Sequence, residues 1–249
     1  MKIETHILAY NEEEIFIYAV RHYATFADRI ILHDLGSTDG TLAIAAQFGI
    51  EVRRWDSKNQ VNDLLNKKIK DEAWRGTDAD WVIMADTDEL IYFPKGAADS
   101  FNSYAAQGLP IVKPQGFEMF SETYPITNGQ IYDEVKFGAR DDRWYAKPII
   151  FNPKLIKSID FSPGAHTCIA TLKSGAKFEN PTKHSEPPAY LLHFHQIGPI
   201  EEIARGYDDH IARMCEGNKK NHWGNFEPGI KHARDKRDYI LSRLEKVIT

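Results

Sequence analysis

The sequence predicts an α/β domain with a mostly parallel sheet flanked by helices. Its 249 residues suit one large domain with a substantial buried core. The composition, with 42% hydrophobic and 27% charged residues, is ordinary for a globular protein. Apolar, strand-like runs alternate with amphipathic segments through the first third of the chain. Such alternation is typical of βαβ units, whose strands lie parallel in one sheet.

The first elements are predicted over residues 3–33. Residues 3–9 are strand-like, and a helix is expected over residues 11–27 with Asn11 as its cap. The three glutamates that follow Asn11 suit the positive end of that helix. A second strand, rich in isoleucine, is expected over residues 29–33, and it leads into the turn-rich segment 34–40.

The remaining elements follow from the same patterns, and no repeat or long linker divides the chain. One domain over residues 1–249 is therefore the expected organisation. Residues 121–129 are expected to form a loop. Further helices are predicted over residues 41–48, 61–74, 199–215 and 229–248, and further strands over residues 50–55, 81–85, 111–120, 147–151 and 189–195.

Charge and composition exclude several classes of function. The formal net charge of -5 argues against a nucleic-acid partner, which favours a basic surface. Neither a secretory pattern nor an apolar run of about 20 residues is present, so no transmembrane segment is expected. The two cysteines, Cys168 and Cys215, lack metal-ligand or redox spacing and suit a reducing compartment. We therefore expect a cytoplasmic protein, with peripheral contact to a membrane left open.

The strongest site signal is the acidic run 86–89, which directly follows the apolar strand 81–85. Ligands of open α/β sheets bind beyond the carboxyl ends of the strands. Asp86 and Asp88 are one residue apart and can share a hard cation such as Mg²⁺ or Mn²⁺ together with substrate phosphates. The alternative is a solvated acidic turn after a strand.

A second polar segment, residues 34–41, follows the second predicted strand. Asp34 lies where a carboxylate can accept a hydrogen bond from a base N–H, and the glycines allow close approach of the backbone. The segment also suits a turn followed by a helix cap. Both roles are compatible.

Three segments together carry a resemblance to a known family. They are Ile7-Leu8-Ala9-Tyr10-Asn11-Glu12, then Ile30-Ile31-Leu32-His33-Asp34-Leu35-Gly36-Ser37-Thr38-Asp39-Gly40-Thr41, then Asp80-Trp81-Val82-Ile83-Met84-Ala85-Asp86-Thr87-Asp88-Glu89. Their order and spacing resemble family 2-type glycosyltransferases, which have the Rossmann-like GT-A fold. The resemblance covers roughly the first hundred residues.

The resemblance implies a nucleotide-sugar site on the first βα turns. It assigns the base and ribose to the end of the first strand and to the segment that begins at Asp34. It assigns the diphosphate and a divalent metal to Asp86 and Asp88. Leu35 and Ala9 depart from residues common in the family, which leaves the nucleotide open. The implied nucleotide-sugar positions are Ala9, Tyr10, Asn11, Glu12, Asp34, Ser37, Asp39, Asp86 and Thr87.

The second half shows a fainter resemblance to a bacterial branch of glycosyltransferases. That branch has a lysine-containing strand, a Gly-x-His turn and a late strand with histidines, which correspond here to segments 146–153, 164–166 and 191–195. We assign Lys147, or a nearby arginine, to the donor diphosphate, and His166 to the diphosphate or the acceptor. A structural turn is the alternative for His166.

Two histidines of the late strand share one face, because His193 and His195 are two residues apart. Leu192 and Phe194 then face the core. One imidazole, assigned to His193, would complete the metal sphere with Asp86 and Asp88, or would bind a phosphate when protonated. The alternative is a hydrogen-bonded pair of histidines on a half-buried strand.

Three carboxylates are candidates for the general base that deprotonates an acceptor hydroxyl. Asp142 and Asp141 are favoured, because Trp144 and Tyr145 beside them offer a platform for a sugar ring. Glu118 is the rival, since an acidic residue within an apolar strand is unusual unless paired or functional. A solvated charged loop is the alternative for the first two.

The sequence as a whole predicts transfer of a sugar from a nucleoside-diphosphate sugar to an acceptor hydroxyl, assisted by Mn²⁺ or Mg²⁺. The resemblance suggests inversion at the anomeric carbon. Residues 1–95 would bind the donor, and residues 96–249, with the C-terminal helices, would bind a glycan or lipid-linked saccharide acceptor. One alternative is a sugar-phosphate nucleotidyltransferase, although the first strand lacks a following Gly-rich basic loop. The other is a non-catalytic module that binds nucleotide sugars.

Overall fold

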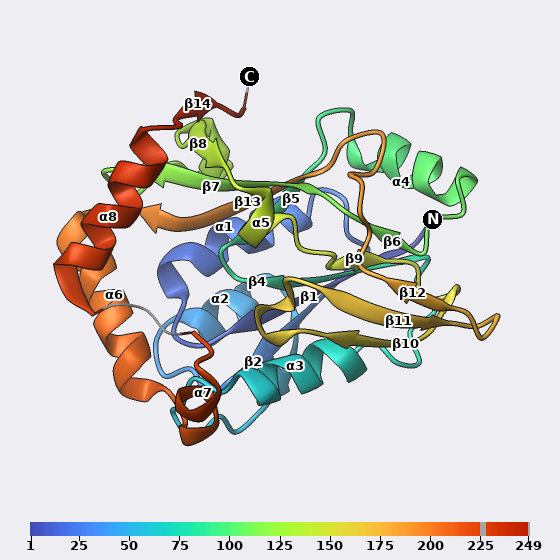
Figure 1. Cartoon of the computed structure of the whole chain (residues 1–249), viewed down its shortest axis with the longest axis horizontal. Helices are drawn as coiled ribbons and strands as arrows, with labels where there is room; N and C mark the ends of the chain where they lie inside the picture. The colour runs from blue at the N-terminus through green and yellow to red at the C-terminus, as the bar shows by residue number, and fades with distance from the viewer. Residues whose placement is uncertain (225–227, 249) are drawn as a thin grey trace.

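The computed structural model describes residues 1–224 and 228–248, and its centre is a six-stranded sheet (Figure 1). The strand order is β3-β2-β1-β4-β9-β6, and the first four strands run parallel. The strand β9 runs antiparallel to both of its neighbours, β4 and β6, so the sheet is mixed. The strands are β1 (Ile3–Ala9), β2 (Arg29–Asp34), β3 (Glu51–Arg54), β4 (Trp81–Asp86), β6 (Ile111–Val112) and β9 (Ile150–Phe151).

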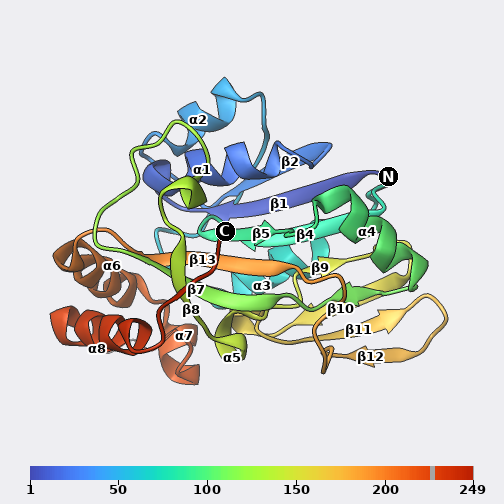
Figure 2. The ribbon, with the colours of Figure 1, turned by 90° about the horizontal axis from the view of Figure 1, so that it is seen from above.

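Helices cover both faces of this sheet. The helices α1 (Glu13–Tyr23) and α2 (Thr41–Gln47) lie on one face, and α3 (Asp63–Glu72) lies on the other (Figure 2). Asn62 caps α3 by accepting a hydrogen bond from the Leu65 N–H at 3.1 Å. Parallel strands in the order 3-2-1-4 with helices on both faces are Rossmann-like. The predicted α/β class is therefore confirmed.

The parallel register places three strand ends at one edge of the sheet. Ala9 pairs with Asp34, and Leu8 pairs with Asp86. Because the strands run in the same direction, the segments after β1, β2 and β4 leave the sheet side by side. The polar motifs of the sequence therefore meet at the carboxyl edge.

A second sheet of five strands packs beside the first, in the order β14-β8-β7-β13-β5. Its strand β13 is parallel to β7 and antiparallel to β5. His193 of β13 is in register with Glu89 on one side and Glu118 on the other. The strands are β5 (Glu89–Tyr92), β7 (Gln115–Ser121), β8 (Phe137–Arg140), β13 (Tyr190–Ile197) and β14 (Glu245–Lys246).

The rest of the fold surrounds these two sheets. A third, antiparallel sheet contains β10 (Ile156–Phe161), β11 (Cys168–Leu172) and β12 (Lys177–Glu179). The helices α6 and α8 pack together at the end of the molecule opposite α4 (Figure 1). No helix in the described ranges is both long and apolar enough to span a bilayer. The remaining helices are α4 (Ala97–Ala106), α5 (Asp142–Tyr145), α6 (Ile200–Arg213), α7 (Glu216–Asn221) and α8 (Gly229–Leu241), with short 3-10 helices at Ile131–Asp133 and Pro163–Ala165.

One hydrophobic core joins the two larger sheets. Trp81 of the central sheet and Leu192 of the five-stranded sheet are fully buried within the same cluster. The strand β5 comes from the first hundred residues but belongs to the second sheet, whereas β9 comes from the second half and belongs to the first. The two halves of the chain are therefore interleaved.

Several predicted elements differ from the structure. The sheets are mixed, because antiparallel strands from the second half complete them. The helix expected over residues 11–27 begins at Glu13 and ends at Tyr23. Asn11 does not cap it: its φ is 54°, and its side chain accepts a hydrogen bond from Thr38 instead.

Two long elements were predicted as continuous but are divided. The strand expected over residues 111–120 is split between β6 and β7, which lie in different sheets, at a point that includes Pro114. Proline has no N–H to donate to a ladder. The helix expected over residues 229–248 ends at Leu241, and the chain then pairs with β8 as β14.

Candidate functional site

The site is built on the turn between β4 and β5. Asp86 ends β4, Glu89 begins β5, and Asp88 lies between them. The carboxylate of Glu89 accepts the backbone N–H of Asp86 at 3.0 Å, and the hydroxyl of Thr87 donates to the carbonyl of Leu8 at 2.7 Å. These two bonds fix the turn to the central sheet. Thr87 is buried, so its side chain holds the turn in place.

Two histidines from β13 converge on Asp88. Its carboxylate oxygen Oδ2 lies 3.3 Å from Nε2 of His193 and 3.6 Å from Nδ1 of His195. The two imidazole rings are stacked 5.8 Å apart, so they share one face of the strand as predicted. One ligand atom from each of the three residues lies within 4.8 Å of the others. This spacing fits a single metal ion.

Glu118 orients His193 from the neighbouring strand β7. Its Oε1 lies 2.9 Å from Nδ1 of His193, and the ring of Tyr145 stacks on the imidazole at 4.5 Å. Because its Nδ1 faces Glu118, His193 presents Nε2 to Asp88. A carboxylate behind a histidine is the usual arrangement around metal-binding imidazoles. The structure thus brings Glu118, His193 and Asp88 into one row.

The charges in this row perturb one another. Burial raises the pKa of Asp88, but His193 and His195 outweigh that effect and leave it well below its usual range. Burial lowers the pKa of His193, but Glu118 and Asp88 outweigh it and raise the pKa to about 9. The cluster therefore favours an ionised carboxylate beside positive charge, the charge pattern that a bound cation also satisfies.

Two buried lysines neutralise the other acids of the turn. Lys70 of α3 lies 2.8 Å from the carboxylate of Asp86, and Lys147 lies 2.5 Å from Oε1 of Glu89. Burial and Glu89 raise the pKa of Asp86, whereas Lys70 and Lys147 lower it, and the net direction is upward. The carboxylate of Asp86 is thus directed to Lys70. The group of side chains that could hold a metal ion is formed by Asp88 and the two histidines.

The loops after β1 and β2 are joined by hydrogen bonds. The side-chain oxygen of Asn11 accepts a hydrogen bond from the backbone N–H of Thr38 at 2.7 Å. The backbone N–H of Asn11 donates to the Ser37 hydroxyl at 2.9 Å. Asp39 accepts the N–H of Glu13 at 3.0 Å. The side chains of Asn11, Ser37 and Asp39 therefore hold the two loops together at the carboxyl edge.

Glu12 lies beside the acidic turn. Burial, together with the negative charges of Asp88, Asp39 and Asp86, raises the pKa of Glu12 to about 8. Its electrostatic coupling to three acids shows that it belongs to the same electronegative region. This region can hold a cation.

The remaining positions assigned to the first strand end lie around the same edge. Ala9 is buried, and its carbonyl accepts the N–H of Leu35 at 2.9 Å. The hydroxyl of Tyr10 donates to Asn59, and the guanidinium of Arg213 lies over its ring at 4.5 Å. Arg213 ends α6, so this helix brings the second half of the chain across to the end of β1.

Asp34 opens into a cavity of about 420 Å³ at the ends of β2 and β3. Its side chain is only 1% exposed, and its Oδ1 accepts the N–H of Ser37 at 2.9 Å. The lining residues are Asp34, Gly36, Ser37, Arg54, Trp55 and Asp56.

The two aspartates proposed as a base differ in their surroundings. Asp142 accepts the N–H of Gly116 at 2.9 Å and pairs with Arg140 at 2.8 Å and with His184 at 3.2 Å. Burial raises the pKa of Asp142, but these donors outweigh it and lower the pKa overall. Asp141 instead accepts a hydrogen bond from the hydroxyl of Tyr239 at 3.3 Å.

His166 lies near the buried lysines Lys147 and Lys70, whose charges act on its imidazole. Its Nδ1 donates to the carbonyl of Trp144 at 2.9 Å, and burial and the charge of Lys147 lower its pKa to about 4. Gly164 has a φ of 70°, and a Cβ there would lie 2.6 Å from Nε2 of His166. Glycine is therefore required for the imidazole to occupy this position.

Two residues of the site were not assigned from sequence. Lys70 reads as part of the solvated face of an amphipathic helix, and only the fold shows that it is buried against Asp86. His195 was considered with His193, but only His193 was assigned to the metal. The alternation along β13 was the available signal for His195, since it places both rings on one face.

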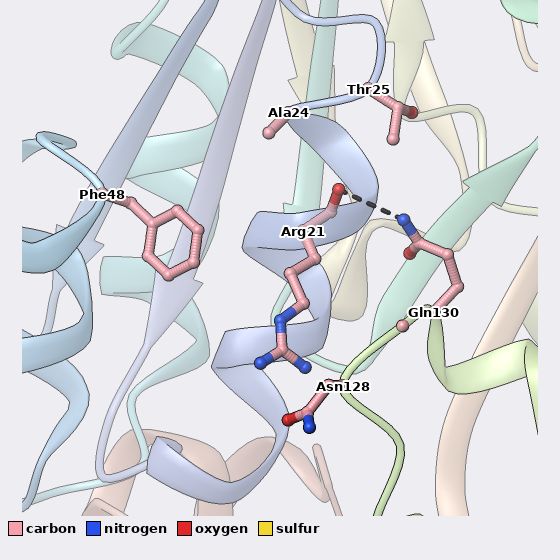
Figure 3. A pocket seen from close by; sticks show the side chains of 7 residues that line it. Arg21, Ala24, Thr25, Phe48, Asn128 and Gln130 are labelled. Atoms are coloured by element: carbon pink, nitrogen blue, oxygen red, sulfur yellow. Dashed lines mark hydrogen bonds between the residues drawn. The ribbon is translucent and has the colours of Figure 1, made fainter.

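A second cavity, of about 400 Å³, lies at the C-terminal end of α1, where Arg21, Ala24 and Thr25 line it (Figure 3). There the amide of Gln130 donates to the backbone carbonyl of Arg21 at 3.4 Å. No acidic or histidine side chain lines this cavity, so it lacks the groups of the site above. Its lining residues are Arg21, Ala24, Thr25, Phe48, Asn128, Gly129 and Gln130.

The structure is similar in part to solved glycosyltransferases. A complex of glucosyl-3-phosphoglycerate synthase from Mycobacterium tuberculosis with Mn²⁺, UDP and glucosyl-3-phosphoglycerate is 20% identical, with a TM-score of 0.34 over 47% of this chain and 44% of that chain. The same enzyme with Mn²⁺, UDP-glucose and phosphoglyceric acid is 19% identical, with a TM-score of 0.33 over 47% and 44%. S. aureus TarS is 13% identical, with a TM-score of 0.43 over 83% and 40%.

Each match covers less than half the length of the solved chain. No protein-family model matches the sequence, and no curated protein matches it. The similarity therefore concerns part of a fold.

Proposed function

We propose that this chain is a GT-A-type glycosyltransferase that moves a sugar from a nucleoside-diphosphate sugar to an acceptor hydroxyl with the help of a divalent cation. The observation that carries the proposal is the convergence of Asp88, His193 and His195 beyond the carboxyl end of β4. It combines the expected position of a ligand in an open α/β sheet with a set of metal-ligating side chains. Asp34 supports the same conclusion from the end of β2, which is separated from β4 by β1 in the same sheet.

The three side chains fit Mn²⁺ better than Mg²⁺. One carboxylate and two imidazoles form a mixed oxygen and nitrogen set, whereas Mg²⁺ prefers oxygen ligands and retains several waters. Asp88, His193 and His195 would hold the ion, and Glu118 would fix the orientation of His193. When bound, the cation would neutralise charge on the leaving diphosphate. Asp86, paired with Lys70, would contact the donor sugar nucleotide beside the ion.

The buried lysines supply fixed positive charge beside that position. Lys147 and Lys70 are both buried, and their ammonium groups hold Glu89 and Asp86 in place. An anionic donor would otherwise meet the three acids Asp86, Asp88 and Glu89. We infer that the lysines reduce this repulsion, so that the site accepts both a cation and a diphosphate.

Among the candidate bases, the contacts of Asp142 and Glu118 leave Asp141 as the candidate we favour. Asp142 accepts hydrogen bonds on both oxygens and has a lowered pKa, which makes it a poor proton acceptor. Glu118 is engaged by His193, so we assign it a positioning role. Asp141→Asn should then lose about a hundred-fold or more in kcat with donor affinity unchanged. If Glu118→Gln or Asp142→Asn loses turnover and Asp141→Asn keeps it, this assignment is wrong.

The domain organisation follows from the same proposal. Residues 1–95 would carry most of the donor site, and residues 96–249 would supply His193, His195 and the acceptor side. The acceptor would be a glycan or a lipid-linked saccharide. His166 and Trp144, whose rings meet edge to face at 5.4 Å, would form one wall of this side.

Calorimetry of UDP binding with Mn²⁺ or with EDTA tests the proposal. We expect binding with Mn²⁺ to be at least tenfold tighter in the wild-type chain, and this difference to vanish in Asp88→Asn. Asp99→Asn is the matched control, because Asp99 is exposed on α4 at the far end of the molecule. Equal affinity with and without Mn²⁺ would refute the metal role. Release of UDP from UDP-sugars distinguishes a transferase from a binding module, and pyrophosphate release from UTP would reveal a nucleotidyltransferase.

A further inference from the structure

Four aromatic rings form a column that includes both histidines of the candidate metal site. The ring of Tyr145 stacks on His193, with centroids 4.5 Å apart and 25° between the planes. His193 stacks on His195 at 5.8 Å and 12°, and the ring of Tyr207 contacts His195 at 5.2 Å and 41°. Tyr145 comes from α5, the histidines from β13 and Tyr207 from α6 (Figure 1). Each imidazole therefore contacts two other rings.

The position of Tyr145 is set by the way α5 packs on β7. The N–H of Asp141 donates to the carbonyl of Gly116 at 2.9 Å, and the N–H of Gly116 donates to Oδ1 of Asp142 at 2.9 Å. A Cβ at Gly116 would lie 2.4 Å from the carbonyl carbon of Tyr145 and 2.7 Å from its Cβ. The helix can therefore approach the strand this closely only because residue 116 is a glycine.

Glu118 acts on the same imidazole as Tyr145. Its Oε1 lies 2.9 Å from Nδ1 of His193. Burial and the charge of Glu118 raise the pKa of Tyr145, so its hydroxyl stays protonated near that carboxylate. Both Glu118 and Tyr145 are buried. His193 is thus held at Nδ1 by a hydrogen bond and on its face by a ring, with Nε2 3.3 Å from the carboxylate of Asp88.

The other end of the column is fixed by the helix α6. The hydroxyl of Tyr207 accepts a hydrogen bond from Nε2 of Gln196 at 2.6 Å, and both side chains are buried. Gln196 follows His195 in β13, so the ring that contacts His195 is tied to the next residue of the same strand. The ring of His232 from α8 meets Tyr207 edge to face at 4.7 Å. Two helices therefore support an imidazole that is 40% exposed.

We propose that Tyr145 and Tyr207 are positioning residues that hold the imidazoles of His193 and His195 in the arrangement that binds the divalent cation. The inference rests on the metal role in the proposed function. Aromatic rings pair in defined geometries, so the stacked neighbours restrict rotation of the imidazoles. Without Tyr145, His193 would keep its hydrogen bond to Glu118 but would be free to tilt about it. Residues that orient metal ligands typically contribute about 10- to 100-fold to metal affinity.

Titration of the chain with Mn²⁺ alone, followed by electron paramagnetic resonance, tests the inference without donor or acceptor. Tyr145→Leu should weaken Mn²⁺ binding by about 10- to 100-fold, because it removes the stacked ring. Tyr145→Phe keeps the ring and should recover most of this loss. Tyr207→Leu should weaken Mn²⁺ binding from the other end of the column.

Gly116→Ala tests the same idea with every ligand and every ring still in the sequence. Its methyl group should displace α5 and move Tyr145 away from His193. The folded variant should therefore bind Mn²⁺ more weakly than wild type. A purely structural role of Gly116 would lower the melting temperature and leave Mn²⁺ affinity unchanged.

Tyr104→Leu is the matched control for the loss of a buried tyrosine. Tyr104 is fully buried in α4, with ring contacts to Trp81 and Phe101, at the end of the molecule opposite α6 (Figure 1). It should lower the melting temperature without changing Mn²⁺ affinity. Co²⁺ in place of Mn²⁺ adds a spectroscopic signature, because its visible absorption depends on ligand geometry. The Co²⁺ bands should shift in Tyr145→Leu and remain those of wild type in Tyr104→Leu.

The outcomes distinguish this inference from the proposed function. If Tyr145→Leu and Tyr207→Leu bind Mn²⁺ as tightly as wild type, or if Tyr104→Leu loses as much affinity, the positioning role is refuted and the transferase proposal stands. If Tyr145→Leu does not fold, Gly116→Ala and Tyr207→Leu decide by the same criterion. If wild type binds no Mn²⁺, the positioning role fails together with the metal role. If the variants weaken Mn²⁺ binding but wild type turns over no UDP-sugar, the positioning role stands and the transferase proposal is refuted.

Discussion

The contribution of the buried ion pair between Lys147 and Glu89 to the site can be tested by measuring the stability of the folded chain. Glu89 is fully buried, and Lys147 is its partner at 2.5 Å. Lys147→Met keeps an apolar chain of similar length but leaves the carboxylate uncompensated next to Asp86 and Asp88. Removing one partner of a buried pair typically costs about 3–5 kcal/mol.

This cost converts into a large shift of the melting temperature. For a domain of this size, each kcal/mol corresponds to about 2–4 °C, so Lys147→Met should melt about 6–20 °C below wild type at pH 7. The double variant Lys147→Met/Glu89→Gln removes both charges and retains an oxygen for the N–H of Asp86. It should recover most of the loss, because replacing a whole buried pair is often nearly neutral.

Thermal unfolding followed by circular dichroism measures these shifts. Lys154→Met is the control: Lys154 pairs with Asp80 at the surface, and such pairs contribute about 1 kcal/mol or less. A melting temperature of Lys147→Met within about 2 °C of wild type would refute the reasoning. So would a double variant no more stable than the single one.

Two other predictions concern buried positions, and a third concerns an exposed glycine of α6. Both nitrogens of buried His22 are engaged, by Ile91 and Tyr132, and burial lowers its pKa from 6.5 to about 4. The imidazole of His22 therefore binds a proton at higher pH in the unfolded chain than in the folded one. The free energy of unfolding should fall by about 3 kcal/mol as the pH is lowered from 6.5 to 4. Urea titrations of His22→Asn should lack this fall. Gly116→Ala should destabilise by about 1–3 kcal/mol, since its Cβ would lie 2.4 Å from the backbone of Tyr145. In Gly206→Ala the added methyl group is unobstructed within α6, so this variant should instead be about 1 kcal/mol more stable than wild type. Urea midpoints equal to that of wild type would contradict the predictions for the two glycine variants.

The carboxyl edge of the central sheet was predictable because local signals determine it. Apolar runs with turn residues after them predict β1, β2 and β4, and the parallel alternation then places Asp34 and Asp86 at one edge. Local sequence does not determine which charged residue becomes buried. The amphipathic pattern around Lys70 predicts that this lysine is exposed to solvent. Lys147 pairs with Glu89, which lies 58 residues earlier in the sequence.

Short strands outside the parallel part of the central sheet were the least predictable elements. Glu89 was interpreted as part of an acidic turn, yet it begins β5, since pairing with β13 decides its conformation. The strands β10 to β12 were not predicted, and β8 contains a glycine that weakens its strand signal. Tertiary pairing, which no local pattern specifies, forms these strands.

The position of β5 explains why the metal-type ligands come from both halves of the chain. Asp88 lies in the two-residue connection between β4 of the central sheet and β5 of the five-stranded sheet. The antiparallel pairing of β5 with β13 aligns Glu89 with His193, and the backbone N–H of Phe194 donates to the carbonyl of Asp88 at 2.8 Å. The same pairing that joins the two sheets therefore sets the distance between Asp88 and the imidazoles. A substitution that shifts the register of β13 by one residue would turn both histidines to the opposite face and remove the cluster, even with every ligand still in the sequence.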